Sequence, residues 1–337
     1  MESGVPSTSR ETQQPIQCIP STSRETQQPI QCSDCDVGYG LFYRLYSGEF
    51  EKIVKYCQSH GVLLADKVCP HCNSACRIDY HLKAFRCDKS VKVGHHKKRK
   101  RCNYRVSIFK NTWFDKSHLD IETNILFIKI FLLDCFSYKF ASCELGVSKK
   151  TINDWSSFAR EVCVNYVVSR PKKIGGEGKI VEIDESKFGK RKYNVGRVVE
   201  GQWVFGGICR ESRDFFMVPV DDRSADTLLT VIKDYIEPGT TIISDCWKAY
   251  DCLASEGYKH FKVNHKVNFV DPNTGAHTNR IERHWRDAKN LVPKYGRTKD
   301  HFVGYLAVAY FKLHFPDVNS RLHYFLKAAA DLYPPSS

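Results

Sequence analysis

Three acidic residues lie on predicted strands and a predicted helix in positions that suit metal-binding carboxylates. Asp184 lies late in KIVEIDESKFG (179–189), which alternates like a strand, and Asp245 ends the apolar run TTIISD (240–245). Glu282 lies in TNRIERHWRDAKN (278–290), which has helical spacing. Carboxylate oxygens suit Mg²⁺ and Mn²⁺, and a pair of such ions activates an attacking oxygen and stabilises a leaving one at a phosphate. The three acids are therefore candidate ligands for two divalent ions.

The predicted helix over 278–290 combines an apolar stripe with a charged one. Its apolar positions recur at i, i+4, i+7 and i+11, namely Ile281, Trp285, Ala288 and Val292. The adjoining face carries Glu282, Arg286 and Lys289. One interpretation is a charge-balanced surface helix. The other is a site in which Glu282 holds metal while Arg286 and Lys289 hold a phosphodiester.

The elements around these acids follow a definite order. Strands are predicted at 201–210 and 214–222, and an amphipathic helix with Ser224 as N-cap at 224–236. A short helix at 248–257 and a strand at 260–265 follow the run ending in Asp245. Three antiparallel strands and then alternating helices and strands predict an α/β, ribonuclease-H-like catalytic domain with a mixed sheet and helices. There the first and fourth strands are neighbours, so Asp184 and Asp245 would meet, and the helix carrying Glu282 would cross the sheet.

Other acids leave an alternative open. Glu182, Glu185, Asp221 and Asp222 lie on or beside the same strands. Aspartates at strand ends are often only solvated surface residues, and spacing does not distinguish such residues from metal ligands.

Composition indicates a globular protein with an anionic partner. The chain has 337 residues, of which 42% are hydrophobic and 26% charged, and its net charge is +13. This excess suits nucleic acid, and an anionic membrane surface is the other possibility. No secretory signal is visible. The most apolar run, 125–133, is short and contains Lys129, which favours a buried helix over a membrane span.

Fifteen cysteines in a chain without a visible signal peptide favour metal binding and burial over disulfides. Cys69 and Cys72 form a C-x2-C pair starting Cys-Pro, and Cys87 and Cys102 each follow after 14 intervening residues. Four thiolates at such spacings close a tetrahedral structural site for one Zn²⁺, in a small zinc ribbon. Substitutes for one ligand stay open, namely Cys76, His81, His95 and His96, as does a chance C-x2-C among unrelated thiols.

Two segments are predicted to contact DNA. The run between the last two cysteines of the ribbon contains five consecutive cations: Lys97, Lys98, Arg99, Lys100 and Arg101. It indicates phosphate contact, nuclear import or both, and a solvated charge run is the alternative. Further on, FASCELGVSKKTINDW resembles a helix-turn-helix with a turn at Gly146 and an N-cap at Ser148. Lys149, Lys150 and Asn153 would then face DNA, unless the two helices form an ordinary helical hairpin.

The N-terminus consists of two identical copies of PSTSRETQQPIQC, at 6–18 and 20–32. Its polar composition predicts disorder. We divide the chain into disordered repeats (1–35), a lead-in helix with the zinc ribbon and basic loop (36–118), a helix-turn-helix-like region (119–174), the catalytic domain (179–315) and a C-terminal helix and tail (316–337).

Residues 179–315 resemble the transposase domain shared by Merlin-type eukaryotic DNA transposons and a group of bacterial, ISXO2-like, insertion sequences. The matching stretches are VEIDESKFGKRKYNVGR, WVFGGICR, IISDCWKAY and HTNRIERHWRDAKN, and the similarity extends back through the cysteine ribbon. The family's acidic triad falls on Asp184, Asp245 and Glu282, and its lysine falls on Lys289. The basic insert splitting the second cysteine pair, and the N-terminal repeats, depart from the family pattern.

The resemblance implies a metal-dependent DDE transposase that cleaves DNA at transposon terminal repeats and transfers the strand to target DNA. Because two ends must be held together, we expect at least a dimer, acting in the nucleus without a membrane. The alternative is a host-adopted, sequence-specific DNA-binding protein without mobility. A stand-alone nuclease would explain the triad but not the two DNA-binding modules.

Overall fold

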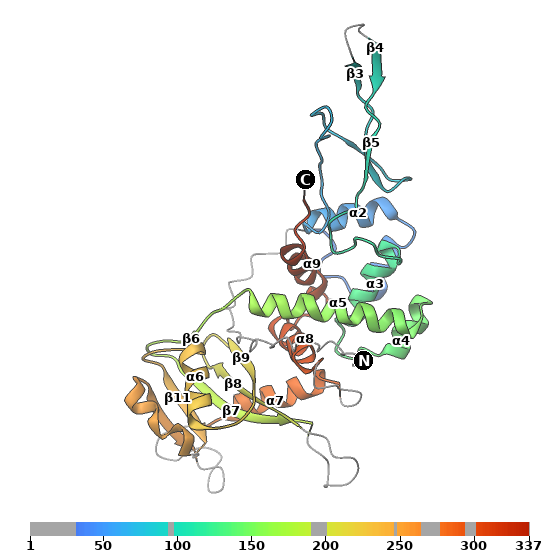
Figure 1. Ribbon diagram of the computed structural model, residues 1–337. Helices are drawn as coiled ribbons and strands as arrows, with labels where there is room; N and C mark the ends of the chain where they lie inside the picture. Colours follow the sequence, from blue (N-terminus) through green and yellow to red (C-terminus); the bar gives the residue numbers. More distant parts are fainter. Residues whose placement is uncertain are drawn as a thin grey trace, which may run out of the picture.

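The computed structural model describes residues 32–93, 98–189, 201–245, 248–263, 277–293 and 301–336. No helix within these ranges is long and apolar enough to cross a membrane. The chain forms a mixed α/β structure in which an elongated N-terminal region and a group of helices lead to a five-stranded sheet (Figure 1). The predicted mixed sheet with helices is confirmed.

The N-terminal region holds two helices and a small sheet. Where we expected one lead-in helix there are two, because the chain turns through Gly48 in a left-handed conformation (φ 74°). Strands β1, β2 and β5 form an antiparallel sheet, and β3 and β4 form a hairpin that projects away from the rest of the chain (Figure 1). The elements are α1 (Tyr39–Tyr46), α2 (Phe50–Ser59), β1 (Arg77–Asp79), β2 (Ala84–Cys87), β3 (Ser90–Val93), β4 (Lys98–Arg101) and β5 (Tyr104–Ser107).

Three helices follow, as the sequence predicts for 119–170: α3 (Ile121–Phe131), α4 (Tyr138–Leu145) and α5 (Lys149–Val168). The apolar run at 125–133 lies mostly in α3 and is buried, including Lys129, whose pKa burial lowers to about 8. Gly146 ends α4 in a left-handed conformation, and the Ser148 side chain accepts a hydrogen bond from Thr151 N at the start of α5. The predicted helix, turn and capped second helix are confirmed, although the second helix continues well beyond Trp155.

The five-stranded sheet has the order β12-β11-β7-β8-β9. β7, β8 and β9 are antiparallel neighbours, whereas β11 runs parallel to β7 and β12 parallel to β11. The predicted adjacency of the strands carrying Asp184 and Asp245 is therefore confirmed. The elements are β6 (Ile174–Gly175), β7 (Ile180–Phe188), β8 (Gln202–Cys209), β9 (Phe215–Val220), α6 (Ala225–Tyr235), β10 (Ile236–Glu237), β11 (Thr241–Asp245), the 3-10 helix η1 (Lys248–Glu256) and β12 (Lys259–Val263).

Helices cover both faces of this sheet. On one face, Val181, Ile183 and Phe205 pack with apolar residues of α6 and η1. On the other, Phe188 and Val204 join a core that continues through α7 (Asn279–Leu291), α8 (Phe302–His314) and α9 (Arg321–Leu332) to the N-terminal helices. Even-numbered positions of β7 thus face α7, because side chains alternate along a strand.

Candidate active site

The pairing of β11 with β7 brings two of the predicted acids together. Residue 241 pairs with 180 and 243 with 182, an offset of 61 residues. The same offset carried along both strands puts Asp245 level with Asp184. Asp245 is the last residue of β11, so its carboxylate lies at the strand's carboxyl end.

The third acid approaches from α7. Glu282 is exposed in the first turn of this helix, and Thr278 Oγ1 lies 3.5 Å from its Oε1. Burial first, and then the negative charges of Asp245 and Glu282, raise the pKa of Asp184 to about 7. Asp245 and Glu282 therefore each lie within electrostatic reach of Asp184, although they are 61 and 98 positions away from it in the chain.

Trp285 fixes the position of Asp184. Its indole Nε1 donates a hydrogen bond to Asp184 Oδ2 at 3.1 Å. The ring fits because Gly206, the residue opposite Asp184 in β8, has no side chain; a Cβ there would lie 2.6 Å from the Trp285 ring. The helical spacing of Trp285 predicts only a core residue, and nothing in that spacing shows that its N–H reaches the acid.

Glu182 has a structural role that was not predicted from the sequence. Its side chain is fully buried, and it accepts hydrogen bonds from Arg210 Nε at 2.6 Å and from the backbone N–H groups of Arg280 and Ile281 at 2.9 and 3.1 Å. A carboxylate at a helix N-terminus satisfies N–H groups that lack partners within the helix. Glu182 thus attaches the start of α7 to β7. The second of these N–H groups belongs to Ile281, the residue directly before Glu282. An acid between Val181 and Ile183, in the apolar first half of the strand, was the available signal.

Three further polar residues near the site differ in burial and in their partners, namely Glu185, Asp221 and His277. Burial first, and then the charges of Asp184 and Asp245, raise the pKa of Glu185 to about 8. Asp221, by contrast, is exposed just beyond β9. His277 places Nδ1 3.5 Å from Glu182 Oε1, and Thr278 is the residue beside Glu282.

The predicted cationic face of α7 is present. Arg286 and Lys289 are exposed four and seven residues after Glu282, and Ile281, Trp285 and Ala288 are buried. Lys289 Nζ lies 5.5 Å from the centre of the Phe188 ring, and Arg286 Nε lies 3.6 Å from Asp287. Two cations and one acid therefore share the solvent-facing side of the helix next to the carboxylates.

The predicted cysteine ligands converge at the other end of the chain. The sulfur atoms of Cys69 and Cys102 lie 3.4 Å apart, those of Cys72 and Cys87 lie 3.3 Å apart, and the four form one group suited to a metal ion. A tetrahedral zinc site with Zn–S bonds of about 2.3 Å separates its sulfurs by roughly 3.8 Å, so these residues fit zinc. Among the alternative ligands, Cys76 and His81 do not join the group, and His95 and His96 lie outside the described residues.

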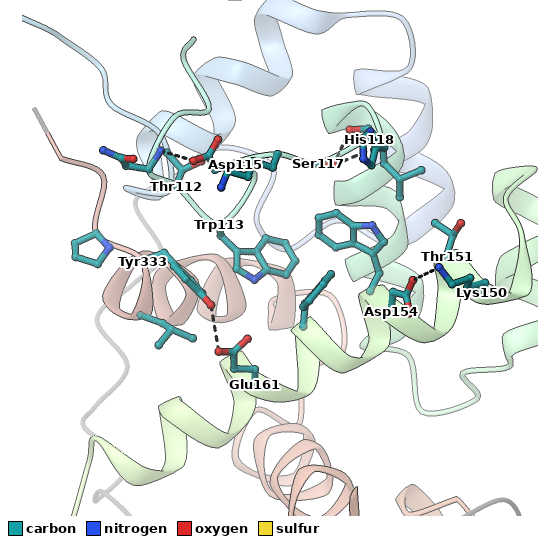
Figure 2. Close-up of a pocket in the computed structure, with 17 residues that line it drawn as sticks. Thr112, Trp113, Asp115, Ser117, His118, Lys150, Thr151, Asp154, Glu161 and Tyr333 are labelled. Atoms are coloured by element: carbon teal, nitrogen blue, oxygen red, sulfur yellow. Dashed lines mark hydrogen bonds and ion pairs between the residues drawn. The ribbon is translucent and has the colours of Figure 1, made fainter. Parts of the chain in front are cut away.

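The basic residues predicted to contact DNA occupy two places. Arg99, Lys100 and Arg101 are exposed on β4, Lys98 begins this strand, and Lys97 lies outside the described residues. Lys149, Lys150 and Asn153 are exposed at the start of α5. Lys150 and Asp154, which lie 3.9 Å apart, line a pocket of about 870 Å³ between α5, the segment 111–119 and the end of α9 (Figure 2). Asp154 therefore offsets part of the positive charge of α5.

Comparisons with known proteins bear on residues 174–313, which match the model of the ISXO2-like transposase domain. A curated Haemophilus influenzae protein described as an uncharacterized transposase-like protein is 27% identical over 108 residues, covering 32% of this chain and 86% of the relative. A chain of a simian T-cell lymphotropic virus intasome structure in complex with the PP2A regulatory subunit B56 gamma aligns with 17% identity and a TM-score of 0.28. The alignment covers 42% of this chain and about half (51%) of the other, and we draw no argument from it. Through residues 174–313, this chain is related to the ISXO2-like transposases.

Proposed function

We propose that this protein is a Merlin-type DDE transposase, a DNA endonuclease and polynucleotidyl transferase that uses two divalent ions. The observation that carries the proposal is the convergence of Asp245 and Glu282 on Asp184, which the pairing of β11 with β7 and the charges of both acids at Asp184 support. Binding to DNA alone requires no such cluster of acids. The strand order of the sheet supports a ribonuclease-H-like catalytic domain, because three antiparallel strands are followed by two parallel strands on the side of β7.

The carboxylates fit Mg²⁺ or Mn²⁺, since both ions prefer oxygen ligands. A bound cation would also favour the charged form of Asp184, which burial first and then the neighbouring carboxylates disfavour by raising its pKa. Asp184, Asp245 and Glu282 would hold the two ions. Such ions, when bound, activate the attacking oxygen and stabilise the leaving oxygen at a phosphate.

Other side chains of the protein position the acids and supply positive charge for the substrate. Trp285 holds the Asp184 carboxylate in place, and Glu182 holds the helix that carries Glu282. Arg286 and Lys289, on the exposed side of the same helix, would bind the phosphodiester beside the acids.

The remaining modules would place DNA at this site. The zinc ribbon, with one Zn²⁺ on Cys69, Cys72, Cys87 and Cys102, presents the basic β3–β4 hairpin. Lys149 and Asn153 on α5 would contact the terminal repeats. We further propose that the active form is at least a dimer, since two transposon ends are joined together, and that it acts in the nucleus.

The test is cleavage and strand transfer with DNA carrying the element's terminal repeats, in Mg²⁺ or Mn²⁺. We expect Asp184→Asn, Asp245→Asn and Glu282→Gln each to lower the rate at least about 10³-fold, the scale of losing one essential catalytic group. Asp221→Asn is the matched control, because it neutralises an exposed acid just after a strand of the same sheet.

The contrary results are distinct. Cleavage that survives Asp245→Asn would refute the proposed site. Specific binding of the terminal repeats without cleavage in either metal would instead identify a host-adopted DNA-binding protein.

A further inference from the structure

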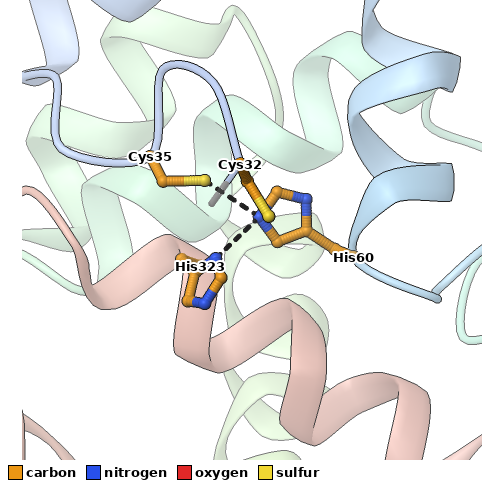
Figure 3. A group of neighbouring side chains, drawn as sticks. All are labelled: Cys32, Cys35, His60 and His323. Atoms are coloured by element: carbon orange, nitrogen blue, oxygen red, sulfur yellow. Dashed lines mark hydrogen bonds between the residues drawn. The ribbon is translucent and has the colours of Figure 1, made fainter. Parts of the chain in front are cut away.

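Two cysteines and two histidines from three distant parts of the chain meet in a second cluster. Cys32 and Cys35 precede α1, His60 follows α2, and His323 lies in the first turn of α9. One sulfur or nitrogen atom of each residue lies within 4.8 Å of the corresponding atom of every other. Figure 3 shows the four side chains pointing toward a common centre. Residues 32–35, expected within the disordered N-terminus, thus form an ordered turn.

The cluster is enclosed. Cys35, His60 and His323 are exposed by only 1%, 3% and 6%, and Cys32 is partly buried. Cys35 belongs to the large apolar core, and Cys32 packs against it. Both cysteines are free thiols 3 positions apart in sequence. Polar groups gathered in such surroundings need partners, because an unpaired buried polar group is costly.

The spacing of the atoms suits a tetrahedral ion. Cys35 Sγ lies 3.1 Å from His60 Nε2, and His323 Nδ1 lies 3.1 Å from the same nitrogen. In a tetrahedral zinc site, bonds of about 2.0 Å to nitrogen and 2.3 Å to sulfur separate the ligand atoms by roughly 3.3–3.5 Å. Both distances are slightly shorter than this range, so a small outward movement of the side chains would admit the ion.

The tautomer of His60 is fixed from outside the cluster. His60 Nδ1 lies 2.6 Å from the backbone carbonyl oxygen of Tyr56, which only accepts hydrogen bonds, so Nδ1 carries the proton. Nε2 is then left with its lone pair directed toward Cys35 and His323. A carbonyl that holds the second nitrogen of an imidazole is the usual support of a histidine metal ligand.

We propose that Cys32, Cys35, His60 and His323 bind one Zn²⁺, in addition to the ion of the ribbon. Two thiolates and two imidazoles are a common ligand set of closed structural zinc sites. The ion would join the turn before α1 to α2 and to α9, linking residues 288 positions apart (35 and 323). Its role is structural, because the cluster is buried and has four protein ligands. A metal-free hydrogen-bonded cluster is the competing arrangement.

The N-terminal repeat supplies a matched control. Each copy ends in a cysteine, Cys18 in the first and Cys32 in the second. Only Cys32 has another cysteine three residues later, since Cys18 is followed by Ile-Pro-Ser. Cys18→Ser therefore removes a thiol from the same local sequence without removing a proposed ligand.

The test is the zinc content of the full chain, purified without a histidine tag and measured by inductively coupled plasma mass spectrometry. We expect two zinc ions per chain in the wild type and in Cys18→Ser. The double variant Cys32→Ser/Cys35→Ser should hold one, and so should Cys69→Ser/Cys72→Ser. One zinc ion in the wild type and none in the ribbon variant would overturn the proposal, and the wild-type count does not depend on how well a variant folds.

Cobalt substitution distinguishes the two sites by ligand type. In the ribbon variant, the remaining Co²⁺ should show thiolate charge-transfer absorption about half as strong, per ion, as in Cys32→Ser/Cys35→Ser, because it has two thiolates instead of four. Absence of this absorption from the ribbon variant, with the wild-type circular dichroism of its helices retained, would also overturn the proposal. His323→Ala should shift or abolish only the two-thiolate spectrum.

Discussion

Glu182 and Asp184 stand two residues apart on the same face of β7, yet their surroundings are opposite. Glu182 is fully buried beside Arg210 and accepts two backbone N–H groups of α7. Asp184 is partly exposed, accepts one indole N–H, and faces the charges of two further carboxylates. Glu182 has hydrogen-bond donors on both carboxylate oxygens, whereas Asp184 faces negative charge. The difference separates an acid that holds two elements together from an acid that we propose binds metal.

Exchanging each acid for its amide tests this comparison most strongly. In Glu182→Gln the amide nitrogen, itself a donor, would face the N–H donors of Arg210 or of α7. Arg210 would also lose its charged partner. We expect unfolding to become easier by about 3–5 kcal/mol, the usual cost of breaking a buried ion pair. Urea denaturation followed by circular dichroism measures the change.

Asp184→Asn is the control on the same strand face, and it should lose catalysis without this loss of stability. If the two variants are equally destabilised, the division between a structural and a functional acid is wrong.

Gly206→Ala should disturb the Asp184 end of β7 alone. An added Cβ would lie 2.6 Å from the Trp285 ring and 2.8 Å from the Phe216 carbonyl oxygen. We expect a loss of about 1–3 kcal/mol in unfolding free energy, typical of overpacking, together with slower cleavage. Gly40→Ala in α1, where nothing lies within 4 Å, serves as the control and should not destabilise the protein. Unchanged stability in Gly206→Ala would show that Trp285 moves freely.

Trp285→Phe removes the hydrogen bond to Asp184 and keeps an aromatic ring. The lost bond is worth about 1 kcal/mol, and without it the pKa of Asp184 should rise further. The acidic limb of the pH–rate profile is therefore expected to move to higher pH. Trp203→Phe, which alters a tryptophan on the neighbouring strand β8, should leave that limb in place. A profile unchanged by Trp285→Phe would mean that the indole does not tune the acid.

The smallest effect concerns pH in the metal-free protein. Asp184 has a pKa of about 7 in the folded chain against 3.8 ordinarily, so folding takes up a proton between these values. The free energy of unfolding should consequently fall as pH rises from about 4 to 7. Asp184→Asn removes the part of this dependence that comes from Asp184, whereas the part from Glu185, whose pKa burial raises to about 8, remains. The melting temperature of Asp184→Asn should therefore exceed that of the wild type at pH 8 and approach it at pH 4. Saturating Mg²⁺ should narrow the difference at pH 8, and a constant difference at all pH values would contradict the assignment.

Much of the site followed from local patterns. Alternation predicts β7, an apolar run predicts β11, and helical spacing predicts that Ile281, Trp285 and Ala288 are buried. These patterns are reliable because each element must bury one face, and burial of one face sets the spacing of apolar residues along the sequence. The C-x2-C spacing of Cys69 and Cys72 is local in the same way.

Contacts between distant elements were not predictable in this manner. Glu182 and Asp221 both appeared to be ordinary acids, and only the packing of α7 on β7 made one of them a buried cap. His60 and His323 are isolated histidines in sequence, 263 residues apart, and Cys32 ends a polar repeat. No periodicity links such residues, since their proximity depends on where α9 docks.

Residue type and short spacing were sufficient to predict the elements, the three acids and the four cysteines of the ribbon. Which acid has hydrogen-bond donors and which faces like charge depended on tertiary packing, since burial and donors come from other elements. Tertiary packing also decided that two cysteines and two histidines share one enclosed space, for the same physical reason.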